Sequence, residues 1–311
     1  MSTIGAIGEG LVELTPDESG SLHVNFGGDA ANIAVMAARL GAQTRIGGRV
    51  GADMLGERLV AFWEHQGVDT SAVVRDPDAA TGRYLNETQP DGGHRFTYWR
   101  TGSAGSRLRP GDLGRAFFQE LAILVVTGVT LAVSPSSAAA ALDAVGRARA
   151  NGGRIACVLN HRPALGGDPA ELAKLARASD IVIASADDAD AVFGVADVPE
   201  RRELLMPGPA EVVVTAGERP AVAARSDALA EQPVPQVQVR NAAGAGDALA
   251  GAYLAARMRD LPLETCLAWG VAAASLSVRK EGCASAYPSA DETLSLATRL
   301  RASELRSNVR V

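Results

Sequence analysis

The chain has 311 residues, of which 47% are hydrophobic and 21% charged, and its 30 basic and 36 acidic side chains give a formal net charge of −6. This length can bury a large core and fits one large α/β domain or two small ones, while the composition excludes a long disordered or fibrous chain. The sequence has no Lys and Arg cluster that could neutralise a phosphate backbone, so we expect no binding of nucleic acid.

The cysteines and the N-terminus bear on the cellular compartment. Cys157, Cys266 and Cys283 lie far apart and form no C-x-x-C or zinc-ligand spacing, which fits a reducing compartment. The N-terminal segment lacks the basic flank of a signal peptide, and no stretch reaches the roughly 18 apolar residues that a membrane helix needs. We therefore expect a cytoplasmic protein with no membrane partner.

The N-terminal part of the chain predicts strands and helices in alternation. The segment from Thr3 to Leu14 alternates small and apolar residues like a strand, and residues 27–42 follow with apolar side chains at helical spacing. A second strand is then predicted before a helix from about Asp53 to His65. We interpret Asp53 and Glu57, one helical turn apart, as solvated rather than catalytic.

Residues 81–101 interrupt the alternation of strands and helices with a segment rich in aromatic residues. Tyr84, Tyr98 and Trp99 lie on either side of Pro-Asp-Gly-Gly at positions 90–93, which is a strong turn signal between two strands. The pattern predicts a β-hairpin, and its aromatic content favours a lid or an interface over another core strand.

The β-α alternation resumes from residue 121. Continuous apolar strands are predicted at 121–129, 153–160, 180–185 and 210–217, with helices at 136–151, 169–178 and 187–193 between them. Such strands are buried on both faces, as in parallel sheets covered by helices. We therefore predict a doubly wound α/β fold that becomes mostly helical from Ala248 onward.

The sequence Gly244-Ala245-Gly246-Asp247 opens the helical part of the chain. A glycine-rich turn at a helix N-terminus directs unpaired N–H groups and partial positive charge to one place, which is an anion site. Asp247 would then lie where a phosphoryl group is held and could accept a proton from an attacking hydroxyl. The alternative is that Asp247 only caps the helix, which is a common role for Asp.

The motifs at both ends of the chain resemble the two signatures of the ribokinase-like (PfkB) carbohydrate kinases: Gly-Ala-Gly-Asp before an apolar helix, and residues 26–59. The resemblance covers essentially the whole sequence. It implies a single domain over residues 1–311, with a mostly parallel sheet flanked by helices and a small β lid inserted at about 9–26 and 80–101. It also implies ATP and Mg²⁺ as cofactors and a homodimer formed through the lid.

Within that family, residues 8–16, 94–108 and 159–167 look most similar to the 2-keto-3-deoxygluconate kinases and the bacterial fructokinases. The resemblance implies that Asp247 is the catalytic base, with Gly244, Ala245 and Gly246 forming the anion site. Two arginines suit a carboxylate, because the guanidinium fork matches its geometry. The implied sugar-binding residues are Gly28, Asn32, Tyr84 and Tyr98, with Arg100 and Arg162 facing a substrate carboxylate.

The resemblance also implies a nucleotide site. It assigns Asp188 to magnesium, through water, and places the following residues near the nucleotide: Asn160, Ser185, Thr215, Gly217, Gly244 and Gly246.

Several positions depart from the family pattern. Asn241-Ala242-Ala243 replaces the usual Asp-Thr-Thr, which argues against activation by a monovalent cation. Ser185 and Asp188 occupy the ends of the family's N-x-x-E, Val158 replaces an Asp, and Pro220 replaces the last Gly of the nucleotide loop. Together these changes leave open whether turnover is reduced.

The sequence thus predicts an ATP-dependent kinase that phosphorylates a terminal hydroxyl of 2-keto-3-deoxygluconate or a similar sugar acid. One alternative is a fructokinase or another sugar or nucleoside kinase of the same fold, and another is a non-catalytic sugar-binding or regulatory protein. A dinucleotide-binding fold and a P-loop enzyme are disfavoured, because neither fingerprint is present at its required spacing.

Overall fold

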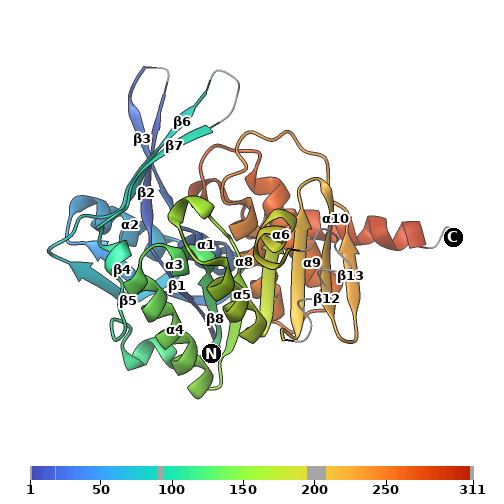
Figure 1. Cartoon of the computed structure of the whole chain (residues 1–311). Helices are drawn as coiled ribbons and strands as arrows, with labels where there is room; N and C mark the ends of the chain where they lie inside the picture. Colours follow the sequence, from blue (N-terminus) through green and yellow to red (C-terminus); the bar gives the residue numbers. More distant parts are fainter. Residues whose placement is uncertain (1, 18, 90–93, 195–207, 309–311) are drawn as a thin grey trace.

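The computed structural model describes residues 2–17, 19–89, 94–194 and 208–308. Within these residues, nine strands form the main sheet in the order β13-β12-β11-β10-β9-β8-β1-β4-β5 (Figure 1). The strands from β11 to β5 in this order run parallel, and β12 pairs antiparallel with both of its neighbours, β11 and β13. Their bounds are β1 (Thr3–Ile7), β4 (Gln43–Gly51), β5 (Val68–Asp76), β8 (Leu121–Thr127), β9 (Arg154–Val158), β10 (Ile181–Ser185), β11 (Glu211–Ala216), β12 (Arg219–Arg225) and β13 (Leu229–Gln232).

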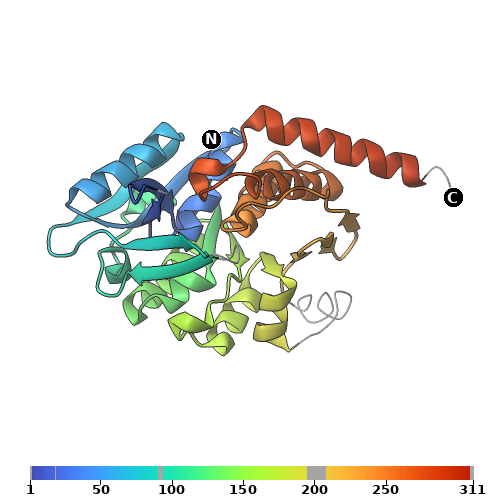
Figure 2. The ribbon, with the colours of Figure 1, turned by 90° about the horizontal axis from the view of Figure 1, so that it is seen from above.

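Helices cover both faces of this sheet (Figure 2). Side chains alternate along β8: Ile123 and Val125 join one buried cluster, with α1, α2, α8 and α9, while Leu124 and Val126 join the other, with α4 and α5. This double burial explains the continuous apolar strands. The helices are α1 (Asp29–Arg39), α2 (Met54–His65), α3 (Gly128–Ala132), α4 (Pro135–Ala150), α5 (Pro169–Ala178), α6 (Ala186–Phe193), α8 (Ala245–Arg257), α9 (Leu263–Ser277) and α10 (Ala290–Asn308).

A second, four-stranded sheet projects away from the main sheet (Figure 1). It contains β2 (Leu11–Pro16), β3 (Leu22–Gly27), β6 (Arg83–Thr88) and β7 (His94–Trp99), in the order β3-β2-β6-β7. We call this sheet the lid. The predicted hairpin supplies β6 and β7, and its predicted turn at 90–93 lies outside the described residues. Together the two sheets confirm the predicted doubly wound α/β fold with a small β lid.

Two boundaries differ from the sequence prediction. The single strand predicted from Thr3 to Leu14 is two strands, because the chain leaves the main sheet after Ile7 and enters the lid at Leu11. Gly10, in this crossing, lies directly against the ring of Trp63 and leaves no space for a side chain. The C-terminal helical part begins at Ala245 rather than Ala248, so the glycine-rich turn is already the first turn of α8.

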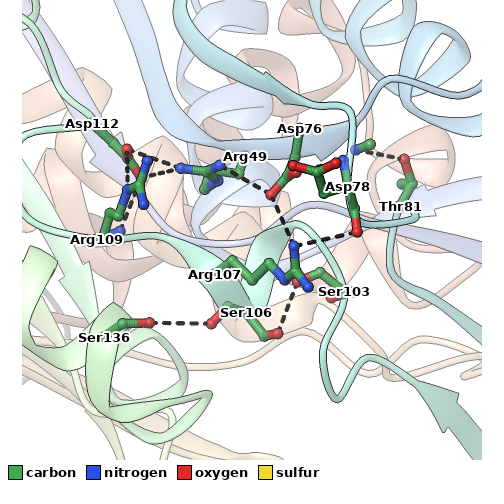
Figure 3. Close-up of polar contacts among 11 residues, drawn as sticks. Arg49, Asp76, Asp78, Thr81, Ser103, Ser106, Arg107, Arg109, Asp112 and Ser136 are labelled. Atoms are coloured by element: carbon green, nitrogen blue, oxygen red, sulfur yellow. Dashed lines mark hydrogen bonds and ion pairs between the residues drawn. The ribbon is translucent and has the colours of Figure 1, made fainter.

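A buried network of charges joins β4 to the segments that come just before β6 and just after β7 (Figure 3). Arg49, on β4, donates to both carboxylate oxygens of Asp112 at 2.9 and 2.8 Å and to Asp76 at 3.0 Å. Arg107 and Arg109 extend the network toward solvent. A buried charge is tolerated only when it is paired and hydrogen-bonded. Arg49, Asp76 and Asp112 are all paired in this way.

Asp53 has a structural role that the sequence interpretation missed. Its carboxylate caps α2 by accepting from the Gly56 N–H at 2.8 Å, and it also accepts from the N–H and hydroxyl of Thr81, at 2.8 and 2.7 Å. These bonds tie α2 to the chain just before β6. Glu57 is exposed, as expected. No helix in the described part of the chain combines the length and the hydropathy needed to cross a membrane.

Candidate active site

Two helices, α1 and α8, begin next to the lid and pack tightly against each other. A methyl group added at Gly251 of α8 would lie 2.5 Å from the backbone oxygen of Ile33 in α1. Bulky side chains along this face of α8 would therefore force the helices apart. The run of Ala and Gly after Asp247 is explained by this close approach, which brings the first turns of both helices together.

The approach places Asn32 and Asp247 in contact. The side-chain N–H of Asn32 donates to Asp247 Oδ2 at 2.9 Å, and the Asp247 side chain is buried. Burial, and then the nearby charge of Asp29, raise the pKa of Asp247 to about 7, although the Asn32 hydrogen bond and Arg162 act in the opposite direction. A carboxylate with its pKa near neutrality is suited to accept and release a proton.

Asp29 is a second buried acid that sequence reasoning did not select. Its carboxylate accepts from the Ala30 N–H at 2.8 Å and from the Asn160 amide at 2.9 Å. Burial raises the pKa of Asp29 in spite of these bonds and of the Thr127 hydroxyl and Arg162. The available signal was an acid inside the Gly-Gly-Asp-Ala-Ala-Asn motif, directly before an apolar helix.

Gly28 and Gly244 begin the two helices. Gly28 has a φ of +105°, and a side chain there would collide with the Glu9 backbone oxygen. Gly244 has a φ of +78°, in the left-handed region that glycine adopts most readily. The N–H of Ala245 approaches the Ala242 oxygen at 3.3 Å, which leaves Gly246 and Asp247 as the principal N–H donors for an anion.

Asn241, where the family pattern has Asp, shapes the loop before this turn. Its side-chain oxygen accepts from the Ala243 N–H at 2.8 Å, which is an Asx turn, and the residue is buried. The amide oxygen of Asn241 makes this bond as the oxygen of an Asp would, but without a charge.

A polar cavity of about 220 Å³ brings together most of the residues expected near the nucleotide phosphates. Ser185 caps α6 by accepting from the Asp188 N–H at 3.0 Å, and Asp188 in turn accepts from the His161 N–H at 3.1 Å. The polar lining is Asn160, Arg162, Ser185, Asp188, Thr215, Gly246 and Asp247.

A larger cavity of about 700 Å³ adjoins the polar one, since Thr215, Gly246 and Leu249 line both. Gly217 contributes at a φ of +65°. Most of the remaining lining is apolar: Ala216, Ala221, Val234, Pro235, Val237, Val239, Ala242, Ala245, Val271, Ala274 and Val278. An apolar cavity that ends in a polar one at a helix N-terminus fits a flat heterocycle linked to phosphates.

Pro220 does not disrupt this region. The register of β11 and β12 shifts between Val214 and Ala216, so Pro220 lies beside an irregularity. A proline is tolerated at such a bulge, because no ladder hydrogen bond is lost.

The lid contributes Tyr84 and Tyr98, whose ring centroids lie 5.3 Å apart. Tyr84 is buried, and its hydroxyl lies 3.7 Å from Cys283 Sγ, whereas Tyr98 is exposed. Glu13, on the neighbouring strand β2, is also buried and accepts from the Asn86 amide at 2.7 Å. Sequence reasoning missed Glu13, which reads as an ordinary polar position in an alternating strand.

The two arginines expected to face a substrate carboxylate differ in their surroundings. Arg100 forms a buried ion pair with Glu9, and burial lowers the pKa of Arg100 to about 10. Arg162 is exposed, lines the polar cavity and donates to the His161 backbone oxygen at 3.0 Å. In this structure Arg162 is therefore the more available cation.

Comparison with known proteins identifies the family of this chain. Residues 3–290 match the pfkB family of carbohydrate kinases. The chain is 31% identical over 306 residues to a 2-dehydro-3-deoxygluconokinase of Thermoproteus tenax, covering 94% of this chain and 93% of the relative. It is 30% identical over 298 residues to the Escherichia coli protein of the same name, covering 90% of this chain and 96% of the relative.

Solved structures of sugar and nucleoside kinases share the fold of this chain. A fructokinase from Xylella fastidiosa with bound ATP superposes with a TM-score of 0.86 at 27% identity, covering 96% of this chain and 98% of that one. An aminoimidazole riboside kinase from Salmonella enterica superposes with a TM-score of 0.83 at 24% identity, over 95% and 99% of the two chains, and supports the fold alone. The chain therefore belongs to the pfkB family of carbohydrate kinases and is a phosphotransferase that acts on sugars.

Proposed function

We propose that this kinase transfers the γ-phosphoryl group of ATP to a terminal hydroxyl of 2-keto-3-deoxygluconate (2-dehydro-3-deoxygluconate) or a similar sugar acid. The observation that carries the proposal is the buried Asp247, held by Asn32 at the N-terminus of α8 and at the wall of the polar cavity. The names of the relatives from Thermoproteus tenax and Escherichia coli favour this substrate.

The proposed reaction uses Asp247 as the base. Asp247 takes the proton of the sugar hydroxyl while that oxygen forms a bond to the γ-phosphorus, and the bond from that phosphorus to the oxygen bridging it to the β-phosphate breaks to release ADP. The N–H groups of Gly246 and Asp247, at the positive end of α8, stabilise the charge on the transferring phosphoryl group. Closure of the lid over the sugar excludes water, which is a competing acceptor.

The two adjoining cavities suit ATP. The adenine would occupy the apolar cavity, and the phosphates would extend past Gly246 toward Asn160 and Ser185. Magnesium carried by the phosphates would neutralise part of their charge, and Asp188, which lines the polar cavity, would hold it through water.

The carboxylate of the substrate would pair with Arg162, which lines the polar cavity that also contains Asp247. A neutral sugar such as fructose is the second candidate, because the Glu9 ion pair leaves Arg100 less available for a second carboxylate contact. Asn32 Oδ1 is buried and has no hydrogen-bond partner among the described residues, so it can accept from a hydroxyl of either sugar.

We also propose that the enzyme is a homodimer formed through the lid. Large apolar side chains are exposed on this sheet, and exposed strand edges with such side chains favour pairing with a second copy. Leu22, Phe96, Tyr98 and Trp99 are 54%, 38%, 49% and 47% exposed. Light scattering of the wild type and of a Trp99→Arg variant tests the proposed dimer: we expect a dimeric wild type and a weakened dimer in the variant. A monomeric wild type would contradict the proposal.

A coupled assay of ADP release tests the proposed reaction. Wild type and Asp247→Asn are compared with magnesium and ATP on 2-keto-3-deoxygluconate, fructose, ribose and a nucleoside. We expect turnover of the keto-deoxy acid that the variant loses. Turnover of neutral sugars alone would replace the substrate and keep the mechanism, and full activity of the variant would overturn the assignment of the base.

A further inference from the structure

The segment from Gly282 to Tyr287 lies between α9 and α10 and touches both the first turn of α8 and the lid. It contains one short 3-10 helix, Ala284–Ala286, and it packs against β3 and α1. We call it the bridging segment. The reaction proposed above gives it no role.

Tyr287 contacts the residue that begins α8. Its hydroxyl donates to the Gly244 backbone oxygen at 2.8 Å, and the same oxygen accepts the first helical hydrogen bond, from Ala248 N at 2.9 Å. A side chain at Gly244 would lie 2.9 Å from the Tyr287 hydroxyl oxygen. The peptide unit whose orientation sets the direction of the following N–H groups is thus held from outside the helix.

The hydroxyl that makes this bond is itself fixed. Tyr287 is 3% exposed, and burial and then the charge of Asp247 keep the pKa of its hydroxyl well above the ordinary value, so the group remains a donor. Arg39 of α1 donates to the Tyr287 backbone oxygen and, through Nε, to Gln66 at 2.7 Å. A fully buried ring with both ends bonded has little freedom to move.

The other end of the bridging segment is attached to the lid. Cys283 Sγ lies 3.7 Å from the Tyr84 hydroxyl on β6, and Ser285 Oγ donates to Asn25 Oδ1 on β3 at 3.1 Å. The segment therefore spans from two lid strands to the turn that precedes Asp247.

We propose that Tyr287 is a positioning residue for phosphoryl transfer. Its hydroxyl holds the Gly244 carbonyl, and thereby directs the N–H groups of Gly246 and Asp247 at the transferring phosphoryl group. This inference rests on the proposed function, because it assigns Tyr287 a role in that reaction. Catalysis depends on donors that are oriented before the reaction begins, so a loosened turn costs rate rather than sugar affinity.

The test compares Tyr287→Phe with Tyr253→Phe in the full chain. Tyr253 is also a fully buried tyrosine of this core, and its hydroxyl donates to Glu211 at 2.7 Å, but that bond contacts no residue of the Gly244 turn. Tyr253→Phe therefore removes a buried tyrosine hydrogen bond, here to a carboxylate that also pairs with Arg257, without touching the turn.

For Tyr287→Phe we expect kcat to fall about tenfold, the factor that corresponds to one hydrogen bond, with the sugar KM changed less than about twofold. For Tyr253→Phe we expect a lower unfolding temperature and an unchanged kcat. Equal kcat values for Tyr287→Phe and the wild type, or equal kcat losses in both variants, would overturn the proposal.

A binding measurement keeps this test separate from the proposed function. Affinity for ADP and magnesium is measured with and without aluminium fluoride, which mimics the transferring phosphoryl group. We expect aluminium fluoride to tighten the binding of ADP and magnesium to the wild type and to Tyr253→Phe. For Tyr287→Phe we expect the same addition to tighten this binding by a factor about tenfold smaller. If the wild type phosphorylates none of the sugars, the proposed function fails, and this comparison alone decides the role of Tyr287. No fluoride effect on the wild type would overturn the inference as well.

Discussion

The amide of Asn32 donates a hydrogen bond to Asp247 Oδ2 at 2.9 Å, although the two residues lie at opposite ends of the chain. The contact exists because the first turns of α1 and α8 are brought together by the small residues between the helices. It engages the Oδ2 oxygen of Asp247, and in the proposed reaction the other carboxylate oxygen would accept the proton of the substrate hydroxyl. The family resemblance had assigned Asn32 to the sugar, and its unpartnered Oδ1 still allows that contact.

Replacing Asp247 by Asn should lower kcat by about 10² to 10⁴, the range that a general base contributes. The sugar KM should change little, because Asn can accept the same hydrogen bond from Asn32 and keeps the shape of the site. Steady-state kinetics on the best substrate measure both values. A rise in KM at unchanged kcat would mean that Asp247 binds the sugar without taking its proton.

The same variant should be more stable than the wild type above neutral pH. The pKa of Asp247 is raised to about 7 in the folded state, so folding binds a proton that the unfolded chain has already lost. The free energy of unfolding of the wild type therefore falls as pH rises from about 4 to 7 on account of this group.

Because Asn does not titrate, Asp247→Asn should avoid this loss and gain roughly 1 to 4 kcal/mol at pH 8. Urea unfolding at pH 5 and pH 8 measures the difference. A difference between the two proteins that stayed the same at both pH values would contradict the raised pKa of the Asp247 carboxyl.

Asp29 should control the pH dependence of the reaction. Its nearby charge is, after burial, the second cause that raises the pKa of Asp247. In Asp29→Asn the pKa of Asp247 should fall, so the acidic limb of the kcat/KM profile, near pH 7 in the wild type, should move to lower pH. A pH series from 5 to 9 measures the limb, and an unmoved limb with reduced activity would assign Asp29 to substrate binding instead.

Arg162→Ala should separate sugar acids from neutral sugars. Loss of a guanidinium that pairs with a carboxylate should raise the KM of the keto-deoxy acid by about tenfold or more, while the KM of fructose stays nearly unchanged. Competition between the two sugars in one assay gives the ratio directly.

Arg100→Ala is the less informative arginine variant, because it also leaves the buried Glu9 carboxylate without its partner and should destabilise the fold.

For Arg162→Ala, equal changes in the KM of the keto-deoxy acid and of fructose would remove the argument for an acidic substrate.

The alternation of strands and helices, the lid hairpin and the glycine-rich start of α8 could all be predicted from the amino-acid sequence. These features are encoded over a few neighbouring residues, by apolar periodicity, by glycine in the left-handed region and by turn residues. The glycine-rich turn indicated Asp247, the family resemblance implied Asn160, Ser185 and Thr215, and the structure brings all four to one cavity.

The pairing of polar groups from distant parts of the chain depends on the tertiary structure. Asp29 gains its influence on Asp247 from the packing of α1 against α8, and Arg100 is engaged by Glu9 across the base of the lid. Tyr287 reaches Gly244 from a segment more than 40 residues further along the chain. Such pairings depend on where the core places the ends of distant elements and on how deeply it buries them. A local sequence pattern contains neither the burial of a side chain nor its long-range contacts, because both are properties of the packed chain.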